Sequence, residues 1–577
     1  MFLPRHHPRS FRPLALFGAA GLALLSGSPA AQPARKTPAE TLPAERPGDA
    51  RPALPGFTQP HPFELPPPPP SERPPAIAGG PRVRVTELRV TGNTALSAEE
   101  LRAAAAPYLG RDMGAAELEE LRRALTAVYV RRGFISSGVV LPDQTIRDGV
   151  VTMQVVEGRL TAIEVSGLER MNPAYVVRRL ERRAGPPLDI DALREGVEAL
   201  LQDPLIDRLD ARLAPGLRPG EGVLALGVRE APLLGGGITV SNDRSPTTGG
   251  TGARGDLGLR NLSGWGDQSW FRLARTRGTT ELGAAVEMPV TARDTRVRLA
   301  VDSIKAEVVE APFSALDIVS KTRTLEAGIS QPVHRTATEA ATLDLTFAHR
   351  RSENWLLGEP FNFSAEADNG VTTVSVLRAA QSWTTRSTDT VLAARSTLSL
   401  GLPVFGATRM EGAADGRFAA WLGQVQFARR FGDGGVQLVL RGDVQLASDA
   451  LPTIERFAVG GLASVRGYRE NLMVRDNAVV ASAELRLPVA HAALADGGGD
   501  TGAVQVAAFV DAGRAWNRRG DTPGPGSVWS TGVGVLWAPA PGAGVAVYYG
   551  HALRDVDLPG PRSLQDRGVH IRVTLAR

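Results

Sequence analysis

Charged side chains set among apolar residues are the groups in this 577-residue sequence that could do chemistry. Every second residue of 504–512 is apolar, which places Asp511 on the opposite face of a strand. The same alternation over 479–487 places Glu484 and Arg486 opposite the apolar row. Carboxylates and guanidinium groups attract each other more strongly in a partly dry interior than in water. The chemistry on offer is therefore ion pairing rather than bond making.

Motifs for catalysis or cofactor binding are missing from the sequence. It has no H-E-x-x-H, no P-loop and no G-x-S-x-G elbow, and its acidic residues are not grouped into catalytic pairs. It has no cysteine, which excludes disulfides, thiolate metal sites and a thiol nucleophile. His349 and His570 lie in alternating segments, so we expect them to face a polar interior rather than bind a metal. We predict a protein that is not an enzyme and has no metal, cofactor or nucleotide.

The charge balance argues against nucleic acid as a partner. Sixty-five basic residues against 61 acidic ones leave a formal charge of +4, without a basic run.

Alternation of apolar and polar residues continues through residues 233–577. It is clearest in 296–302, 342–347, 436–441 and 569–575. One apolar and one polar face per strand suits a transmembrane β-barrel with lipid outside and water inside. A soluble β-sandwich alternates as well, but this region is larger than typical sandwich domains and has room for roughly sixteen strands of about ten residues. In a hydrated lumen, a passing peptide would keep its backbone hydrogen-bonded.

The first 81 residues are predicted to direct export and to act as a spacer. Residues 1–31 combine early arginines, an apolar run too short to span a bilayer and a small-residue cleavage site, so we expect a secretory signal peptide. Residues 32–81 are rich in proline, with five in succession at 66–70, and are predicted to form a semi-rigid linker.

A tandem α/β repeat is predicted between the linker and the barrel. Residues 82–158 and 159–232 each read as β-α-α-β-β. Ser97 and Glu100 form a capping box that predicts the start of a helix. The expected fold class is therefore α+β followed by all-β, with the two repeats before the barrel.

Several motifs in fixed order resemble those of the two-partner secretion outer-membrane transporters, the haemolysin and filamentous-haemagglutinin exporters of the ShlB/FhaC/HecB type. They are Tyr129, Gly133-Phe134-Ile135, Val139-Val140-Leu141-Pro142, Gln144, Ile146, Gly149, Val156-Glu157-Gly158, Asn242-Asp243, Gly252, Arg254, Asn261, Gly266-Asp267, the stretch 455–468, and Phe509-Val510-Asp511-Ala512-Gly513. The resemblance covers about residues 82–577.

The resemblance implies two periplasmic POTRA (polypeptide-transport-associated) domains and a 16-stranded antiparallel barrel in the bacterial outer membrane. It also implies that Val465, Arg466, Gly467 and Tyr468 form the tip of a loop folded back into the barrel. Arg466 would then meet Asp511 on the wall, in the motif that also holds Phe509 and Gly513. The alternation adds Glu484 as a second candidate partner. The alternative is that Arg466 is a solvated loop charge and Asp511 an ordinary lumen residue.

The family also implies how the first POTRA domain and the chain before it act. The motif residues Tyr129, Gly133, Phe134, Pro142, Gln144 and Gly158 are the candidates for binding an unfolded partner, which a sheet edge could take as an added strand. The domains could instead be spacers. Family members often place a plug helix before the linker, and the proline content of 32–81 argues against a helix here.

The expected function is export of a dedicated, large, β-rich secreted protein of adhesin or haemolysin type, without nucleotide. Two alternatives stay open: a factor that assembles other barrels into the membrane, and a passive porin.

Overall fold

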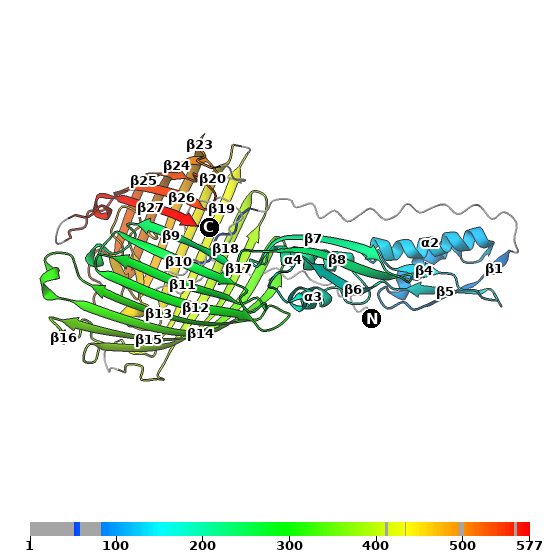
Figure 1. Ribbon diagram of the computed structural model, residues 1–577, viewed down its shortest axis with the longest axis horizontal. Helices are drawn as coiled ribbons and strands as arrows, with labels where there is room; N and C mark the ends of the chain where they lie inside the picture. The colour runs from blue at the N-terminus through cyan, green and yellow to red at the C-terminus, as the bar shows by residue number, and fades with distance from the viewer. Residues whose placement is uncertain are drawn as a thin grey trace, which may run out of the picture.

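The structure, a computed structural model, describes residues 51–57, 82–409, 414–432, 434–495, 501–558 and 562–576. The predicted signal peptide lies outside these residues, and of the predicted linker only 51–57 are described. The molecule is elongated, with a barrel at one end and two small α/β units extending from it in line (Figure 1).

The first α/β unit is a three-stranded sheet covered by two helices, with a short two-stranded sheet beside it. Its elements are β1 (Val83–Val85), β2 (Glu87–Thr91), α1 (Ala98–Ala105), η2 (Ala106–Tyr108), β3 (Arg111–Met113), α2 (Ala115–Arg131), β4 (Gly138–Val140) and β5 (Val150–Val156). Strand β5 lies between β2, which is parallel to it, and β4, which is antiparallel. Helix α1 starts at the predicted capping box, because Ser97 and Glu100 satisfy each other's backbone N–H groups. The leucines of α2 face the sheet and are buried.

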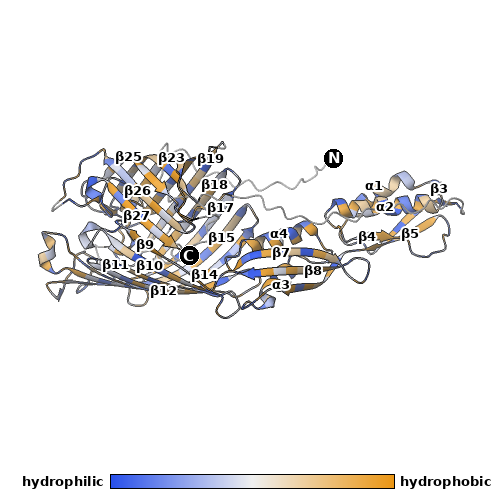
Figure 2. Ribbon diagram, turned by 45° about the horizontal axis from the view of Figure 1, so that its top comes forward, coloured by the Kyte–Doolittle hydropathy of each residue, from blue (hydrophilic) through white to orange (hydrophobic). Residues whose placement is uncertain are grey.

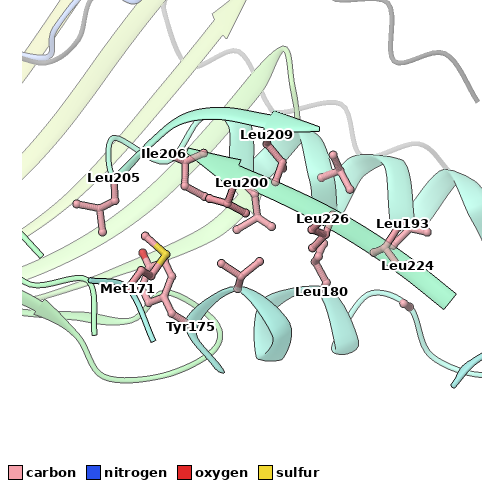
Figure 3. Close-up of a cluster of buried hydrophobic side chains, with 14 of the residues drawn as sticks. Met171, Tyr175, Leu180, Leu193, Leu200, Leu205, Ile206, Leu209, Leu224 and Leu226 are labelled. Carbon is pink, nitrogen blue, oxygen red and sulfur yellow. The ribbon is translucent and has the colours of Figure 1, made fainter. Parts of the chain in front are cut away.

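The second α/β unit repeats this topology. It consists of β6 (Arg159–Ser166), α3 (Pro173–Glu181), α4 (Ile190–Leu201), β7 (Ile206–Pro215) and β8 (Glu221–Glu230), with β8 between parallel β6 and antiparallel β7. The helices pack leucines such as Leu180, Leu193 and Leu200 onto Leu224 and Leu226 of β8 (Figure 3). Because the two units share strand order and strand directions, the predicted tandem repeat is present. The exact division of the chain into domains stays a prediction.

A carboxylate at the same place in each unit holds the turn before the first helix. Glu157 accepts hydrogen bonds from the backbone N–H groups of Thr94 (2.6 Å) and Ala95 (2.9 Å). Glu230 does the same for three successive N–H groups, including that of Met171 (2.7 Å). These bonds satisfy donors that the turns leave without a strand partner.

Hydrogen bonds join the two units to each other and the second unit to the barrel. The carbonyls of Gly133 and Gly158 accept from the N–H groups of 190 and 188, at 3.1 and 2.6 Å. On the other side, Arg179 of α3 pairs with Asp294 (3.1 Å), in a tight turn of the barrel. We call the end of the barrel that carries this turn the domain end, and the opposite end the far end.

Residues 234–576 form a closed antiparallel barrel of sixteen strands. The strands are β9 (Leu234–Ser241), β10 (Gly252–Arg260), β11 (Gln268–Thr276), β12 (Thr279–Pro289), β13 (Arg296–Glu307), β14 (Val319–Arg335), β15 (Glu339–Leu356), β17 (Val371–Arg386), β18 (Thr390–Leu402), β19 (Ala419–Phe431), β20 (Val436–Ala447), β23 (Asn477–His491), β24 (Ala503–Trp516), β25 (Ser527–Trp537), β26 (Ala543–Ala552) and β27 (Val569–Ala576). The short β16 (Glu359–Pro360) pairs with the end of β15 at the far end. The turns carry η3 (Pro246–Thr248), η4 (Phe313–Leu316) and η6 (Gln565–Arg567). Strand β27 pairs with β9 and closes the ring.

The alternation along these strands divides an apolar outer face from a polar inner one, and Figure 2 shows hydrophobic and hydrophilic residues following each other along the strands. In β24 the predicted apolar row is exposed on the outside, while Gln505, Phe509 and Asp511 are buried inside. No helix in the described part of the chain has the length and apolar composition needed to cross a membrane.

One of the two predicted interior histidines was assigned to the wrong face. His570 is buried on the inner face, as expected. His349 pairs across the strands with Leu325, whose exposed side chain belongs to the outer face. There its Nδ1 lies 3.0 Å from the hydroxyl of Ser375, and its ring contacts Phe405 of a loop at the far end. The sequence contained a signal for the outer face, because His349 continues the apolar row formed by the odd-numbered residues of 343–347.

Candidate functional site

The candidate site is built on the loop 448–476, which connects β20 and β23 at the far end. The loop carries η5 (Thr453–Glu455) and a hairpin of β21 (Phe457–Val459) and β22 (Met473–Arg475). Its tip holds Val465, Arg466 and Tyr468, all buried. Because side chains of the barrel wall surround them, this loop turns inward into the lumen.

Arg466 meets Asp511 on the inner face of β24. Its Nε donates to Oδ2 at 2.8 Å and its Nη2 to Oδ1 at 2.9 Å, while its backbone N–H also donates to Oδ2 at 3.0 Å. Arg466 is 1% exposed and Asp511 fully buried. A two-point contact between guanidinium and carboxylate fixes orientation as well as distance.

Glu484 and Arg486 extend the pair into a four-membered ionic cluster. Arg466 Nη1 donates to Glu484 Oε2, and Arg486 Nε donates to Glu484 Oε1 at 2.6 Å. The hydroxyl of Ser482 donates to Asp511. Two arginines and two carboxylates thus balance within a buried site. Removing one partner of such a buried pair costs about 3–5 kcal/mol, because the other charge stays in a poorly solvated place.

Two aromatic rings flank the guanidinium of Arg466. Its Cζ lies 3.4 Å from the ring centroid of Phe509 and 4.7 Å from that of Tyr548. The Tyr548 hydroxyl also donates to Glu484 Oε1 at 3.1 Å. Cation–π contacts of this kind add about 0.5–2 kcal/mol. Tyr548 was not predicted, because the inner row of β26 consists otherwise of glycine and alanine and gives no polar signal.

The remaining tip residues fit the loop to the wall. Gly467 has φ +90°, and a Cβ there would come within 2.9 Å of the Gly550 carbonyl oxygen. The N–H of Gly467 donates to Nε2 of His570 at 3.1 Å. The hydroxyl of Tyr468 lies 2.8 Å from the carbonyl oxygen of Trp529. The turn at the tip therefore needs glycine.

Gly513 makes room for the loop on the wall. A Cβ at this position would come within 2.6 Å of Val459 and 2.9 Å of Val465. The wall motif of Phe509, Asp511 and Gly513 thus supplies a ring, a charge and a gap, all used by the same loop.

Residues 51–57 also lie inside the barrel, against β19 and β20. Arg51 pairs with Asp443 (Nε to Oδ2 3.6 Å), and the amide of Gln426 donates to the carbonyl of Pro52. The guanidinium of Arg430 lies 4.4 Å from the ring centroid of Phe57. The segment is neither helix nor strand, and the absence of a plug helix from 32–81 stays a prediction. It is nevertheless part of the lumen filling, which the prediction of a mere spacer did not include.

Three of the six residues predicted to bind a partner in the first α/β unit have little exposed surface in this structure. Tyr129, Gly133 and Gly158 are buried. The Tyr129 hydroxyl donates to Asn93, and a Cβ at Gly158 would come within 2.7 Å of Ser136 Cβ. These residues lie in the core and at the joint between the two units, and their part in binding a partner stays a prediction.

The other three, Phe134, Pro142 and Gln144, are half-buried. Phe134 packs edge-on against Tyr129. Gln144 exchanges two hydrogen bonds of 2.7 Å with the backbone of Thr152, which completes β5 beyond the end of β4. Gln144 therefore occupies a stretch of sheet edge, and partner binding by these three residues stays a prediction.

Across the residues that the structure places, no three histidine or acidic side chains are grouped to hold a metal ion. What the lumen offers is an ionic lock on a loop, together with polar side chains along the wall.

Comparisons with known proteins agree on one family. Residues 220–536 match the family described as haemolysin secretion/activation protein ShlB/FhaC/HecB, and residues 83–158 match the ShlB-type POTRA domain. The outer membrane transporter CdiB of Dickeya dadantii is 26% identical over 478 residues, covering 80% of this chain and 81% of the relative.

Solved structures show the same fold. CdiB from Escherichia coli has a TM-score of 0.66 at 22% identity, over 89% of this chain and 94% of the other. BamA from Haemophilus ducreyi, in a form lacking POTRA domains 1–3, has a TM-score of 0.51 at 14% identity, over 86% and 100% of the two chains.

Proposed function

Since the chain belongs to the haemolysin secretion/activation family, we propose that it captures an unfolded secreted partner in the periplasm and exports it through the barrel lumen. Members of this family are outer-membrane transporters of two-partner secretion rather than enzymes. The domain end of the barrel faces the periplasm and the far end the cell exterior. The partner, in this proposal, is a large β-rich protein of adhesin or haemolysin type, as the resemblance implies.

The observation that carries the proposal is how the lumen is filled. The loop 448–476 and the segment 51–57 occupy it, and neither is a strand of the wall. Both are held by ion pairs and hydrogen bonds, which water and a passing chain can replace. The wall behind them presents polar side chains such as Gln424, Gln445 and Ser530. A peptide crossing this path would keep its backbone groups hydrogen-bonded.

Capture needs an accessible sheet edge in the periplasmic units. Strand β4 does not offer one at Val139, because Thr126 Oγ1 accepts from its N–H (3.1 Å) and Arg122 donates to its carbonyl (3.0 Å). In the part of the chain that the structure describes, β2 pairs on one side only, with β5. We therefore propose that the partner adds as a strand along β2, beside the exposed side chain of Arg89.

The test is site-specific photo-crosslinking in cells that also make the partner. A photoreactive residue in place of Arg89 should crosslink to the partner during export. The matched position is Arg102, which is exposed on helix α1 of the same unit and should not crosslink. Removal of residues 82–158 should stop export while the barrel still conducts ions.

Two outcomes would overturn the proposal. Export of the partner without loss after removal of 82–158 would exclude capture by this unit. If removal of 82–158 instead depleted the membrane of unrelated outer-membrane proteins while export of the partner continued, the alternative of an assembly factor would be favoured.

A further inference from the structure

The loop 448–476 meets the barrel wall at a second ionic cluster, which lies at its base rather than at its tip. Glu455, at the end of η5, is 2% exposed. Arg378 of β17 donates from Nη2 to both carboxylate oxygens, at 2.8 and 2.7 Å. Arg350 of β15 donates from Nη1 to Oε1 at 3.1 Å. One carboxylate of the loop therefore bridges two arginines of the wall.

Backbone contacts strengthen the attachment at the same point. Arg350 also donates to the carbonyl oxygen of Ile454 at 2.8 Å. The amide of Gln445, on β20, donates to the carbonyl oxygen of Glu455 at 3.2 Å. The loop base is thus fixed through its side chain and its main chain together.

The two clusters lie on different parts of the ring. Strands β18, β19 and β20 separate β17, which holds Arg378, from β23, which holds Glu484. Between the clusters, Arg441 of β20 donates to the carbonyl oxygen of Ser464 at 3.2 Å. The loop therefore follows the inner wall from one cluster to the other, and the position of its base determines where its tip can reach.

The charges of the two clusters are reversed. At the tip the loop supplies the arginine and the wall supplies Asp511 and Glu484, whereas at the base the loop supplies the carboxylate and the wall supplies the arginines. Arg350 and Arg378 lie on neighbouring strands, where Arg350 pairs with Val374 and Arg378 with Thr346. Both side chains face the lumen, because both contact Glu455 of the loop. Neutralising Glu455 would leave these two like charges without the carboxylate that bridges them, in a poorly solvated place.

We propose that Glu455 is a positioning residue that holds the base of the loop on β15 and β17, so that Arg466 lies opposite Asp511. The two attachments use different residues of the loop and different strands of the wall. The inference rests on the proposed function only where it concerns export, since the position of the loop is a property of the transporter without its partner.

The test uses the absence of cysteine from the chain. A Ser464→Cys variant places one thiol in the buried tip, where Ser464 is 2% exposed. The purified full-length protein in detergent is labelled with a water-soluble maleimide, and the labelling rate reports how often the tip leaves the wall. Glu455→Gln in this background should raise the rate by about tenfold or more, as expected for the loss of one partner of a buried ion pair. Glu455→Asp should keep a slower rate than Glu455→Gln.

The matched control is Asp344→Asn. Asp344 accepts from Arg395 (2.8 Å) and from Ser330 (2.7 Å) on the wall, so its neutralisation should leave the rate unchanged. A Glu455→Arg/Arg378→Glu double variant keeps the same three charges in exchanged places and should label more slowly than Glu455→Arg alone.

Equal labelling rates for Glu455→Gln and Asp344→Asn, in protein that keeps the electrophoretic mobility of the folded barrel, would overturn the proposal. So would a double variant no slower than Glu455→Arg. Neither result would touch the proposed function, because neither measurement involves the partner.

Discussion

Arg466 shows what a single side chain contributes at this site. It is saturated by partners on three strands, with Asp511 on β24, Glu484 on β23 and the Tyr548 ring on β26. A contact of this kind is specific, because a guanidinium offers a planar fork that lysine lacks. It is also reversible, because no covalent bond holds the loop.

Replacing Arg466 with alanine should abolish or sharply reduce secretion of the partner while the barrel stays in the membrane. The loss leaves Asp511 and Glu484 short of a counter-charge and should cost about 3–5 kcal/mol in loop attachment. Secretion and surface-exposed barrel are measured in the same cells. The matched control is Arg514→Ala on β24, the strand of Asp511, where the arginine is exposed on the outer face.

The pairing itself is tested by exchange. A double variant of Arg466→Asp and Asp511→Arg should recover part of what each single reversal loses. Losses that simply add would remove the pairing from the account and leave Arg466 with some other role.

At the scale of elements, the carboxylates Glu157 and Glu230 link the sheet of each POTRA unit to the turn before its first helix. Burial alone would raise the pKa of Glu157, but hydrogen bonds from Thr94 and Ala95 outweigh it and hold the pKa below the ordinary value of 4.5. The ionised form is therefore the one that stabilises the turn.

The stabilisation should be complete above the ordinary pKa and should disappear as the pH falls through the lowered pKa of the folded state. Hydrogen exchange of residues 93–97 is the measurement, with Glu157→Gln compared with the parent at each pH. The parent should be better protected at neutral pH, and the difference should shrink as the pH falls below 4.5 and vanish below the lowered pKa of the folded state. The turn at 169–171 is held by Glu230, so its hydrogen exchange at each pH should be the same in Glu157→Gln as in the parent. A difference that persists unchanged in acid would mean that Glu157 acts by shape rather than by charge.

Much of the element order could be predicted from the sequence, because the spacing of apolar residues differs between helices and strands and can be recognised within a short segment. The start of α1 agrees with the prediction, since the capping box of Ser97 and Glu100 is a clear end signal. The faces of β23 and β24 also agree, because side chains alternate strictly along a strand. The small pair of β1 and β3 was missed, since three-residue strands leave no period to detect.

Contacts between distant segments could not be predicted in the same way. Glu455 lies in a stretch noted for its family resemblance, but nothing local to it indicates that Arg350 and Arg378 converge on it. In the first POTRA unit, likewise, the motif alone did not indicate which of its residues are buried. Tyr129 is buried in the core, and a Cβ at Gly158 would meet Ser136.

For the molecule as a whole, the lumen is filled by two segments, one before the POTRA units in the sequence and one after them. Residues 51–57 precede these units and the loop 448–476 follows them, yet both lie against the inner wall. In this structure, therefore, both segments occupy the lumen.

Removing residues 51–57 should raise the ion conductance of the barrel in planar bilayers, because the segment's contacts with Asp443 and Arg430 would be replaced by water. The control is a deletion of the same length at 61–67, which shortens the chain before the POTRA units but keeps the segment. Identical conductance for the two deletions would mean that 51–57 does not limit the pore.

The strands of the barrel differ in length around the ring, and this has a consequence for the surrounding lipid. Strands β9 and β27, at the closure, have 8 residues each, while β14 and β15 have 17 and 18. A strand that crosses the hydrocarbon layer needs about 9–11 residues. The bilayer must therefore be compressed beside β9 and β27 and can keep its full thickness beside β14 and β15. Lipids with longer acyl chains would increase this elastic load on one side of the protein, at the position where the ring is closed by five residue pairs.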